Sequence, residues 1–512
     1  MKKYSSRFLI YTAVCTGLTA CASLPSLEGR SESSYLKIDS APRLDGVLNT
    51  YRQNSQNSGK SGIYLLNDAH EAFLARAALI ESADYTLDLQ YYIWHNDYSG
   101  KMLFNLLHRA AERGVRVRLL LDDNNTNGLD NVLLALDSHP NIEIRLFNPF
   151  TNRKWRALGY LTDFPRLNRR MHNKSLTADN RATIVGGRNI GDEYFKVHQD
   201  TVFADLDILA VGRVVGEVSE DFDRYWASGS SYPAADIIKK GNIEQGIQEL
   251  EYSAQEKKDI LERYRQELQA SDLFRSLQNN SIKWFDAQTE LISDDPAKGL
   301  NRSRHQEPLG ERLFAALQKP EKSLYLVSPY FVPTRSGVET LSELAKEGVA
   351  VTVLTNSLQA TDVAAVHSGY AKYRKPLLQS GIELYELKPN HAVPKTKDRG
   401  LTGNSATSLH AKTFIVDQKR VFIGSFNLDP RSERLNTEMG VVIESPKIAG
   451  IMYRTLANTT PDYAYKVTLD QNRRLHWQHP DDKKHYTTEP EAGFWKRVTA
   501  KILSYLPIEG LL

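Results

Sequence analysis

The sequence predicts an α/β protein of two tandem domains, each a mostly parallel β-sheet flanked by helices, with an active site at their interface. A strand–helix–strand pattern occurs twice along the chain, and each copy is followed at almost the same offset by a histidine-containing strand. The length of 512 residues and the 41% apolar content supply enough material for more than one hydrophobic core.

The first copy begins with an apolar strand at 86–92, continues with a helical pattern and returns as a strand at 114–121. The second copy has strands at 323–330 and 348–354 around another helical pattern. Each copy has the pattern of a βαβ unit in a covered sheet. The repeat therefore indicates a duplicated α/β domain.

The N-terminus has the layout of a signal peptide. Basic residues precede the apolar run 8–14, which is too short to span a bilayer, and the Leu-Thr-Ala-Cys that follows at 18–21 resembles a bacterial lipobox. This pattern predicts removal of residues 1–20 and lipidation of Cys21, which anchors the mature chain to a membrane. We expect residues 21–60, rich in Ser, Asn, Gln and Gly, to form a flexible tether.

The N-terminal domain is expected at 61–234 and the C-terminal domain at 281–465, separated by a charged helical insert at 235–280. The tail at 466–512 contains an amphipathic helix with basic residues between its apolar positions. Two interpretations of that helix stay open: it lies on anionic lipid, or it packs on the body of the protein.

Charge and cysteine content argue against several classes of site. Residues 1–20 contain three basic and no acidic residues, so the mature chain has 62 of each and does not favour broad nucleic-acid binding. Cys15 lies in the leader and Cys21 is the lipidation site, so no disulfide or cysteine-ligated metal is expected. No histidine spacing is typical of a zinc site, and we expect no metal and no cofactor.

Two motifs that match position for position carry the chemistry. Each has a histidine, a lysine two residues later, an aspartate five residues after the lysine, and then a Gly-x-x-Asn turn. Their residues are His172, Lys174, Asp179 and Asn189 in the first copy, and His410, Lys412, Asp417 and Asn427 in the second. Each motif is expected to form a hairpin in which histidine and lysine share a face of the strand.

This combination of side chains suits a phosphodiester. The two lysines neutralise charge that develops on the phosphoryl oxygens, and the asparagine amides donate hydrogen bonds to them. One imidazole attacks phosphorus, while the other protonates the leaving alcohol and then acts as the base for the acceptor. A covalent phosphohistidine follows from this logic, but the symmetry of the motifs does not assign the two roles.

The duplicated motif resembles that of the phospholipase D superfamily, from about residue 62 to residue 461. Within it, the segments 167–195 and 506–512 are similar to the cardiolipin synthase C group. The resemblance implies two tandem phospholipase D-like domains, with His172 as the nucleophile and His410 as the general acid and base.

The resemblance also implies that Glu438 orients a catalytic imidazole. Its counterpart in the first half is Asp205 or Asp207, and both stay open. Although Asp179 and Asp417 belong to the catalytic motifs, we expect them to pin their hairpin turns and not to contact substrate.

The two copies also differ at one position of the Gly-x-x-Asn turn. Gly187 stands where the second copy has Ser425, so a hydroxyl is available on one side only. The two halves are therefore not equivalent.

The reaction that the resemblance implies is phosphatidyl transfer, in which phosphatidylglycerol and a second phospholipid give cardiolipin. Phospholipids, and a membrane surface reached through the lipid anchor, are the expected partners; no nucleic acid is expected, and the sequence identifies no protein partner. The anchor places the body in the periplasm, and Ala22 after the cysteine favours the outer membrane over the inner membrane.

Three alternative functions stay open. They are a hydrolytic phospholipase D that releases phosphatidic acid, an envelope phosphodiesterase or nuclease, and a non-catalytic lipid-binding lipoprotein.

Overall fold

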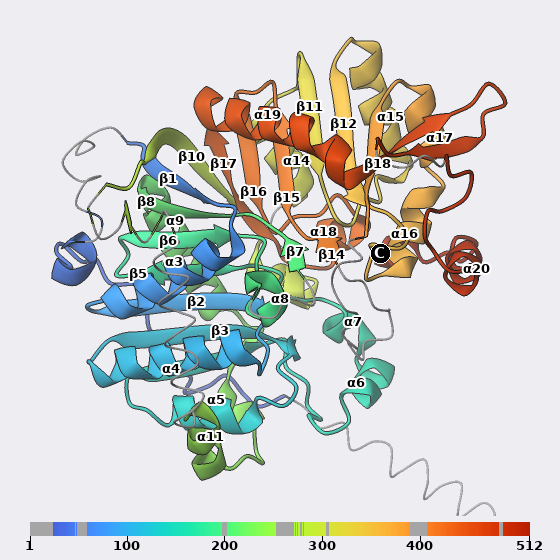
Figure 1. The fold of residues 1–512 in the computed structure, drawn as a ribbon. Coiled ribbons are helices and arrows are strands. Elements are labelled where there is room, and N and C mark those ends of the chain that lie inside the picture. Colours follow the sequence, from blue (N-terminus) through green and yellow to red (C-terminus); the bar gives the residue numbers. More distant parts are fainter. Residues whose placement is uncertain are drawn as a thin grey trace, which may run out of the picture.

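The computed structural model describes residues 24–46, 59–196, 202–251, 281–303, 307–389, 407–480 and 485–512, together with positions 48, 271, 273, 275, 276 and 279. Within these residues, one 17-stranded mixed sheet runs through two halves of the chain and carries helices on both faces (Figure 1). The signal segment, Cys21 and much of the helical insert lie outside the described residues.

The two halves contain equivalent strands. Those of the first half are β1 (Ser61–Leu66), β2 (Thr86–Ile93), β3 (Arg116–Asn125), β4 (Ile142–Phe147), β5 (Ser175–Ala178), β6 (Ala182–Gly186), β8 (Asp207–Gly212) and β9 (Ser231–Pro233). Those of the second half are β10 (Phe285–Ser293), β11 (Ser323–Val327), β12 (Ala350–Asn356), β13 (Glu383–Leu387), β15 (Lys412–Val416), β16 (Arg420–Gly424), β17 (Met439–Glu444), β18 (Ala464–Leu469) and β19 (Leu475–Gln478).

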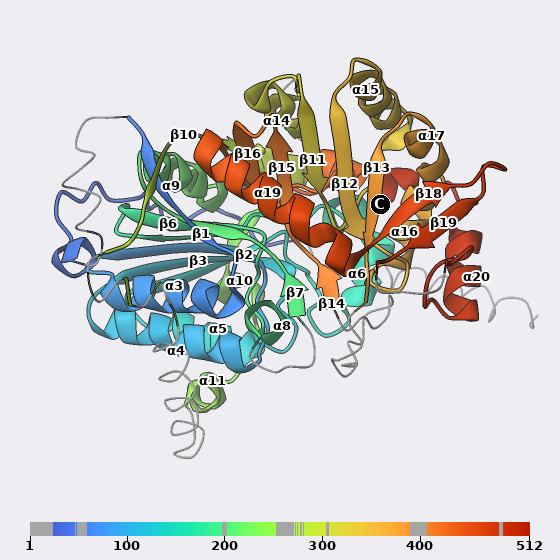
Figure 2. The same ribbon diagram turned by 45° about the horizontal axis from the view of Figure 1, so that its top comes forward.

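The helices that flank the sheet also repeat. In the first half α3 (Ala69–Ser82) and α4 (Tyr98–Glu112) cover one face and α9 (Arg213–Trp226) covers the other; in the second half α14 (Leu309–Leu317) and α15 (Thr334–Lys346) lie opposite α19 (Pro446–Tyr463) (Figures 1 and 2). The shorter elements used below are α5 (Asp130–Asp137), α6 (Arg156–Thr162), α7 (Phe164–Leu167), α8 (Asp192–Phe195), α11 (Ile243–Leu250), α16 (Ala364–Ala371), α20 (Phe494–Leu503), β7 (Val202–Ala204) and β14 (Thr407–Leu409).

The predicted duplication of an α/β domain is confirmed. The strand order β4-β3-β2-β5-β6-β8-β1 of the first half repeats as β13-β12-β11-β15-β16-β17-β10 in the second. Parallel pairing within each half is restricted to the three strands of the βαβ region, and the motif hairpins β5–β6 and β15–β16 add antiparallel strands. The sheet is therefore mixed and not mostly parallel as expected, because the two strands of each hairpin run antiparallel and pair antiparallel with their neighbours.

The halves are joined by a shared strand pair and a shared core. β1 pairs antiparallel with β10, so the hydrogen-bonded sheet continues from one half into the other. One hydrophobic cluster contains buried residues of both halves, including Ile63, Val185, Ile423 and Val441. Burial of these side chains stabilises the docked arrangement, since removing one such side chain from water contributes about 1.5–3 kcal/mol.

The N-terminal segment differs from the flexible tether that its composition predicted. Residues 24–46 lie against the first half: the Arg30 guanidinium donates to the backbone oxygens of Ser228 and Ser231, at 2.6 and 2.7 Å, and Ala41 and Leu44 are fully buried. Buried Arg118 in turn donates to the Ser33 carbonyl oxygen at 2.9 Å. Arginines of the segment and of the body thus donate to each other's backbone oxygens, a role that composition does not reveal.

The insert and the tail are only partly described. α11 lies within the predicted insert and packs on α5, where Asn242 N donates to Asn131 Oδ1 at 2.8 Å. In the tail, β18 extends the second sheet beside β13, and α20 occupies the position of the predicted amphipathic helix. Among the described helices, none is both long and apolar enough to cross a bilayer.

The motif aspartates Asp179 and Asp417 connect each hairpin to the start of a neighbouring strand. Asp179 accepts hydrogen bonds from the backbone N–H groups of residues 84–86, at 2.7–2.8 Å, just before and at the start of β2. Asp417 accepts from residues 321–323, at 2.7–3.0 Å, before β11. Each carboxylate therefore binds three consecutive backbone donors where the chain enters a strand.

We predict that Asp179→Asn destabilises the protein by about 1–3 kcal/mol, because an amide leaves one or more of these donors without an acceptor. Thermal unfolding checks this, and the midpoint should fall by several degrees. Asp286→Asn, at an exposed position of β10, is the matched control and should leave the midpoint unchanged. An unchanged midpoint in Asp179→Asn together with lost turnover would instead assign this aspartate a direct part in the chemistry.

Candidate active site

His172 is positioned by pairing with the other half of the protein. Met171 forms a parallel bridge with Thr437, and His172 N donates to the Thr437 carbonyl oxygen at 2.8 Å. The histidine therefore precedes its predicted strand, which begins at Ser175 as β5. This short pairing places the His172 ring beside the residue that follows Thr437, which is Glu438.

The segment of His410 makes the reciprocal connection. β14, directly before the histidine, pairs in parallel with β7 of the first half, and His410 N donates to the Ala204 carbonyl oxygen at 2.9 Å. The residue after Ala204 is Asp205. Each motif histidine is thus carried to an acidic residue of the opposite half.

The two imidazoles are held by crosswise carboxylates. His172 Nδ1 lies 2.8 Å from Glu438 Oε2, and His410 Nδ1 lies 2.6 Å from Asp205 Oδ2. A carboxylate at Nδ1 favours the neutral tautomer with its proton on Nδ1, which leaves the Nε2 lone pair for attack on phosphorus or for proton transfer. The prediction that Glu438 orients an imidazole agrees with this geometry.

The structure decides between the two candidates for the first-half acid. Asp207 is buried and pairs with two arginines, Arg76 at 2.9 Å and Arg188 at 3.3 Å. Asp205, two residues earlier, points to His410. Residues two apart share one side of an extended chain, so spacing alone does not separate these two acids. The β7–β14 pairing ends at Ala204 and places Asp205 beside His410, whereas Asp207 begins β8 and meets the two arginines.

Lys174 and Lys412 are buried close to the imidazoles, and each Nζ donates to the backbone oxygen of its own motif histidine. Burial lowers the pKa of Lys174 to about 7 and that of Lys412 to about 8, against the raising effect of Glu438 and Asp205. A nearby anion raises the pKa of such a lysine and so stabilises its charged form. The two side chains are thus suited to hold an anionic group such as a phosphoryl group.

The two histidine–carboxylate pairs differ electrostatically. Burial raises the pKa of Glu438 to about 7, and burial together with Lys174, Lys412 and His410 lowers the pKa of His172 well below its ordinary value. Burial opposes ionisation of Asp205 as well, but His410 and Lys412 outweigh it and hold its pKa below the ordinary value. A firmly ionised carboxylate supports a protonated imidazole better than one that itself binds a proton near pH 7.

Residues that the sequence analysis did not assign to the site line the imidazoles. The Tyr92 ring lies 4.9 Å from the His172 ring and 5.5 Å from Lys174 Nζ, and the Tyr194 ring lies 5.3 Å from His410. Tyr194 OH also accepts from Asn189 Nδ2 at 3.0 Å, while Ile93 N donates to Asn189 Oδ1 at 3.1 Å. For Tyr92, the run of aromatic residues at the end of β2 was the available signal, whereas Tyr194 lies in α8.

The protein contacts of Asn189 fix its amide, and Asn427 is buried at the equivalent turn of the second half. The structure thus brings the two histidines, two lysines and two asparagines of the motifs to one region. The two motif aspartates lie at the far ends of their hairpins, where they hold backbone.

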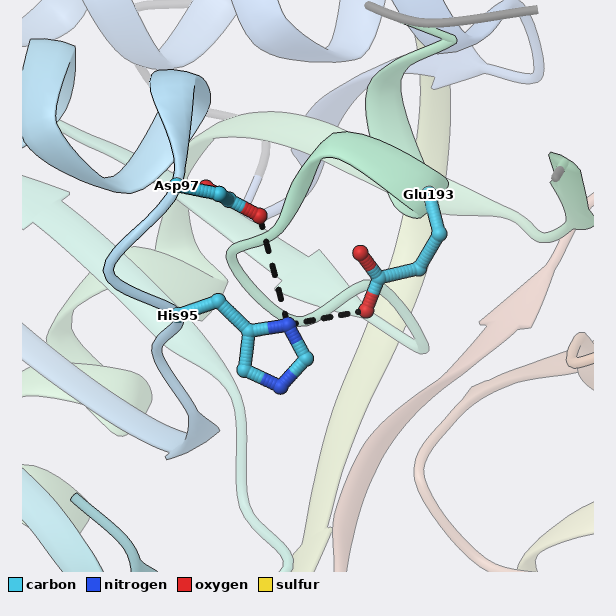
Figure 3. Close-up of side chains that lie close together, drawn as sticks. All are labelled: His95, Asp97 and Glu193. Carbon is cyan, nitrogen blue, oxygen red and sulfur yellow. Dashed lines mark ion pairs between the residues drawn. The ribbon is translucent and has the colours of Figure 1, made fainter. Parts of the chain in front are cut away.

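His95 belongs to a second cluster at the start of α4. Its Nδ1 lies 3.2 Å from Glu193 Oε1 and 4.0 Å from Asp97 Oδ2 (Figure 3). These side chains are the one group among the described residues whose geometry would allow a metal ion to be held. Asp97 already caps α4 by accepting from Gly100 N at 3.0 Å and accepts from Asp192 N at 2.8 Å, so the cluster ties α4 to α8.

The Gly187/Ser425 difference has a steric cause. A Cβ on Gly187 would lie 2.1 Å from Asp205 Oδ1, so no side chain fits. On the other side, the longer Glu438 leaves room for Ser425, whose hydroxyl donates to Glu438 Oε2 at 2.5 Å. Each acid is thus supported in a different way.

We predict that Gly187→Ala reduces turnover of a phosphodiester at least about 100-fold, because displacement of Asp205 removes the orienting partner of His410. Hydrolysis of a soluble nitrophenyl phosphodiester measures this effect. Gly216→Ala, at a helical position with open space around the Cβ, is the control and should retain wild-type turnover. Equal activity of both variants would show that Asp205 need not contact His410.

Comparison with known proteins places these features in a family. The family model described as "Cardiolipin synthase, PLD-like domain" matches residues 77–226 and 313–459, one match in each half. Cardiolipin synthase C of Escherichia coli (strain K12) is 49% identical over 90% of this chain and 98% of its own length, and cardiolipin synthase A of Pseudomonas entomophila is 25% identical over 88% of this chain and 77% of its own length.

Among solved structures, phosphatidylserine synthase of Haemophilus influenzae has a TM-score of 0.52 at 14% identity, covering 82% of this chain and 91% of that chain, which supports the fold alone. The paired family match and the high identity over nearly the whole length are decisive for the relationship. The chain belongs to the cardiolipin synthase family of phospholipase D-like proteins.

Proposed function

We propose that this protein is a phosphatidyltransferase that makes cardiolipin from phosphatidylglycerol and a second phospholipid through a phosphohistidine. The observation that carries the proposal is the crosswise pairing of two imidazoles with two carboxylates beside two buried lysines. The names of the relatives, which are cardiolipin synthases, support the choice of phosphatidyl transfer among phosphodiester reactions.

In the first step, Nε2 of His172 attacks the phosphorus of the donor lipid. A P–N bond forms, the P–O bond to the leaving alcohol breaks, and His410 gives its proton to that oxygen. His172 suits the nucleophile because its pKa is the more strongly lowered of the two, which keeps its lone pair available. His410 suits the acid because ionised Asp205 stabilises its protonated form.

In the second step, the terminal hydroxyl of phosphatidylglycerol attacks the phosphohistidine. Its proton passes to His410, the new P–O bond forms and the P–N bond breaks, so the enzyme returns to its starting state. Lys174 and Lys412 neutralise the phosphoryl oxygens in both steps, and Asn189 and Asn427 contribute their amides at the rim of the same site. Asp179 and Asp417 act through the backbone that they hold.

The phosphodiester substrate is an anion, and its charge changes the protonation of the groups around it. Two lysines and two carboxylates around neutral imidazoles balance each other, so a phosphodiester adds one negative charge. That charge raises the pKa of the surrounding cations and favours uptake of a proton by His410. Substrate binding thereby supplies the acid that the first step requires.

We also propose that the mature chain is a lipoprotein attached through Cys21 and facing the periplasm, with the outer membrane favoured. Support comes from the lipobox-like sequence and from Ala22 after the cysteine. The corresponding division is a leader at 1–20, domains at 61–234 and 281–465, an insert at 235–280 and a tail at 466–512. Phospholipids are the partners in this proposal, and no cofactor, metal or nucleic acid takes part.

We predict that the purified protein makes cardiolipin in defined vesicles of phosphatidylglycerol and phosphatidylethanolamine. Mass spectrometry of the lipids measures this conversion. His172→Ala should abolish turnover of every substrate. His410→Ala should lose about 100- to 10,000-fold with the natural lipid, but far less with a nitrophenyl ester whose leaving group needs no acid.

Each alternative has its own result in this assay. Phosphatidic acid without cardiolipin would indicate hydrolysis. Rescue of His172→Ala by the nitrophenyl ester, and not of His410→Ala, would exchange the roles of the two histidines. Full activity of both variants would contradict the proposed site.

We predict an alkaline decline of kcat/KM. The lysines have pKa values near 7 and 8 in the free site, and they are charged below and neutral above those values. Capture of an anionic diester should therefore weaken as the pH rises from about 7 to 9. A pH profile with a soluble nitrophenyl diester, which keeps one negative charge over this range, measures the decline. A flat profile would contradict titration of these lysines.

A further inference from the structure

The helix α6 has the reverse of the usual orientation of an amphipathic helix. Trp155, at its N-terminal cap, Leu158 and Leu161 recur at every third position, with exposed fractions of 61, 53 and 82%. Phe164, at the start of α7, adds a further side chain that is 44% exposed. No residue of α6 is buried. Isolated exposed apolar residues are ordinary, but four within ten residues of one another on two short helices are not, and they are here called the α6–α7 apolar face.

The polar side of the same helix is turned towards the protein. Arg156 Nη1 donates to the Asp123 carbonyl oxygen at 2.6 Å, and Tyr160 OH donates to Asn124 Oδ1 at 2.8 Å. Just before the helix, Arg153 pairs with Asp130, with Nε at 3.0 Å. These contacts attach the polar face of α6 to the body of the protein. The apolar face of α6 is therefore turned outward by specific hydrogen bonds on its other side.

The α6–α7 apolar face lies close to the chemistry along the chain. α7 ends at Leu167, which is buried, and only four residues separate it from His172. The connecting segment is itself fixed: Asn148 Nδ2 donates to the Arg169 carbonyl oxygen at 2.9 Å, and Met171 N donates to Asp122 Oδ2 at 2.8 Å. A surface seated on α6 therefore has a short, rigid connection to the nucleophile.

A second helix with exposed apolar side chains lies in the C-terminal tail. α20 packs beside α16 and buries only Ala500, while Phe494, Trp495 and Ile502 are exposed. Both α6 and α20 lie to the right of β14 in the two views (Figures 1 and 2). Basic side chains accompany both helices, namely Lys154 and Arg166 near α6 and Lys496, Arg497 and Lys501 on α20.

We propose that the α6–α7 apolar face docks into the surface of an anionic phospholipid bilayer, with α20 as an additional contact, and so brings the lipid to the active site. Apolar side chains enter the boundary between headgroups and acyl chains, and flanking basic residues remain at the phosphate level. This occupant rests on the proposed function, because a phosphatidyltransferase must take a substrate with two acyl chains out of a bilayer.

The test uses the full lipidated chain in phosphatidylglycerol vesicles. A single cysteine introduced as Leu161→Cys carries an environment-sensitive fluorophore, and Ile247→Cys on α11 is the matched control, since Ile247 is also an exposed apolar residue. The lipidated chain without an added cysteine measures background labelling, since the sulfur of a lipidated Cys21 is blocked. We expect blue-shifted emission and quenching by nitroxide-labelled acyl chains at position 161 and neither at position 247.

Activity provides the second readout. Leu158→Ser combined with Leu161→Ser should reduce turnover of vesicle phosphatidylglycerol about tenfold or more, since weaker docking lowers substrate capture. Turnover of short-chain, monomeric phosphatidylglycerol should be unchanged. Similar fluorescence at positions 161 and 247, or equal losses on both forms of substrate, would overturn the proposal.

The labelling experiment separates this proposal from the proposed function. His172→Ala should keep the fluorescence change while it loses turnover, which supports docking independently of catalysis. A wild-type protein that docks but transfers no phosphatidyl group would sink the proposed reaction and leave the docking surface intact. If the fluorescence of the label at position 161 changed on addition of a protein partner but not on addition of vesicles, the bilayer would not be the occupant.

Discussion

The crosswise hydrogen bonds between histidine and carboxylate are the constraint on which the rest of the molecule depends. His172 lies 2.8 Å from Glu438 and His410 lies 2.6 Å from Asp205, and in both pairs the acid belongs to the opposite half. Neither half contains a complete pair. The active site therefore depends on the strand pair β1–β10 and on the common hydrophobic cluster, because these hold the two halves together.

Duplication supplies the symmetry of this arrangement, and small sequence differences break it. A short acid, Asp205, requires glycine at position 187, whereas the longer Glu438 is supported by the hydroxyl of Ser425. Burial raises the pKa of Glu438, whereas His410 and Lys412 outweigh burial at Asp205 and lower the pKa of that carboxyl. Two identical imidazoles can thereby differ in basicity, which is what a reaction with one nucleophile and one acid requires.

The site contains two buried lysines whose positive charges would be balanced by an anionic substrate. Burial of Lys174 and Lys412 lowers their pKa values, and a phosphoryl group restores the stability of their charged forms. The same principle operates on the outside of the molecule, where α6 keeps its arginine and tyrosine contacts inside and turns apolar residues outward. Both features cost stability in the isolated protein, and under the two proposals contact with phospholipid offsets that cost.

The sequence by itself determined the duplicated α/β domains, the motif hairpins and the identity of the histidines and lysines, because these features depend on local periodicity and on spacing along the chain. The expectation that Asp179 and Asp417 hold backbone is consistent with the contacts in both halves, since a carboxylate at a turn meets nearby backbone donors. Composition was a poor guide for residues 24–46, whose carbonyl groups are acceptors for distant arginines.

Only the tertiary structure decided which carboxylate meets which imidazole. Asp205 and Asp207 are equivalent in sequence, and the choice depends on β7 pairing with β14 some 200 residues away and on the arginines that bind Asp207. The outward orientation of the apolar residues of α6 was likewise set by contacts to Asp123 and Asn124. Such contacts join segments that are remote in the chain, and no local pattern encodes them.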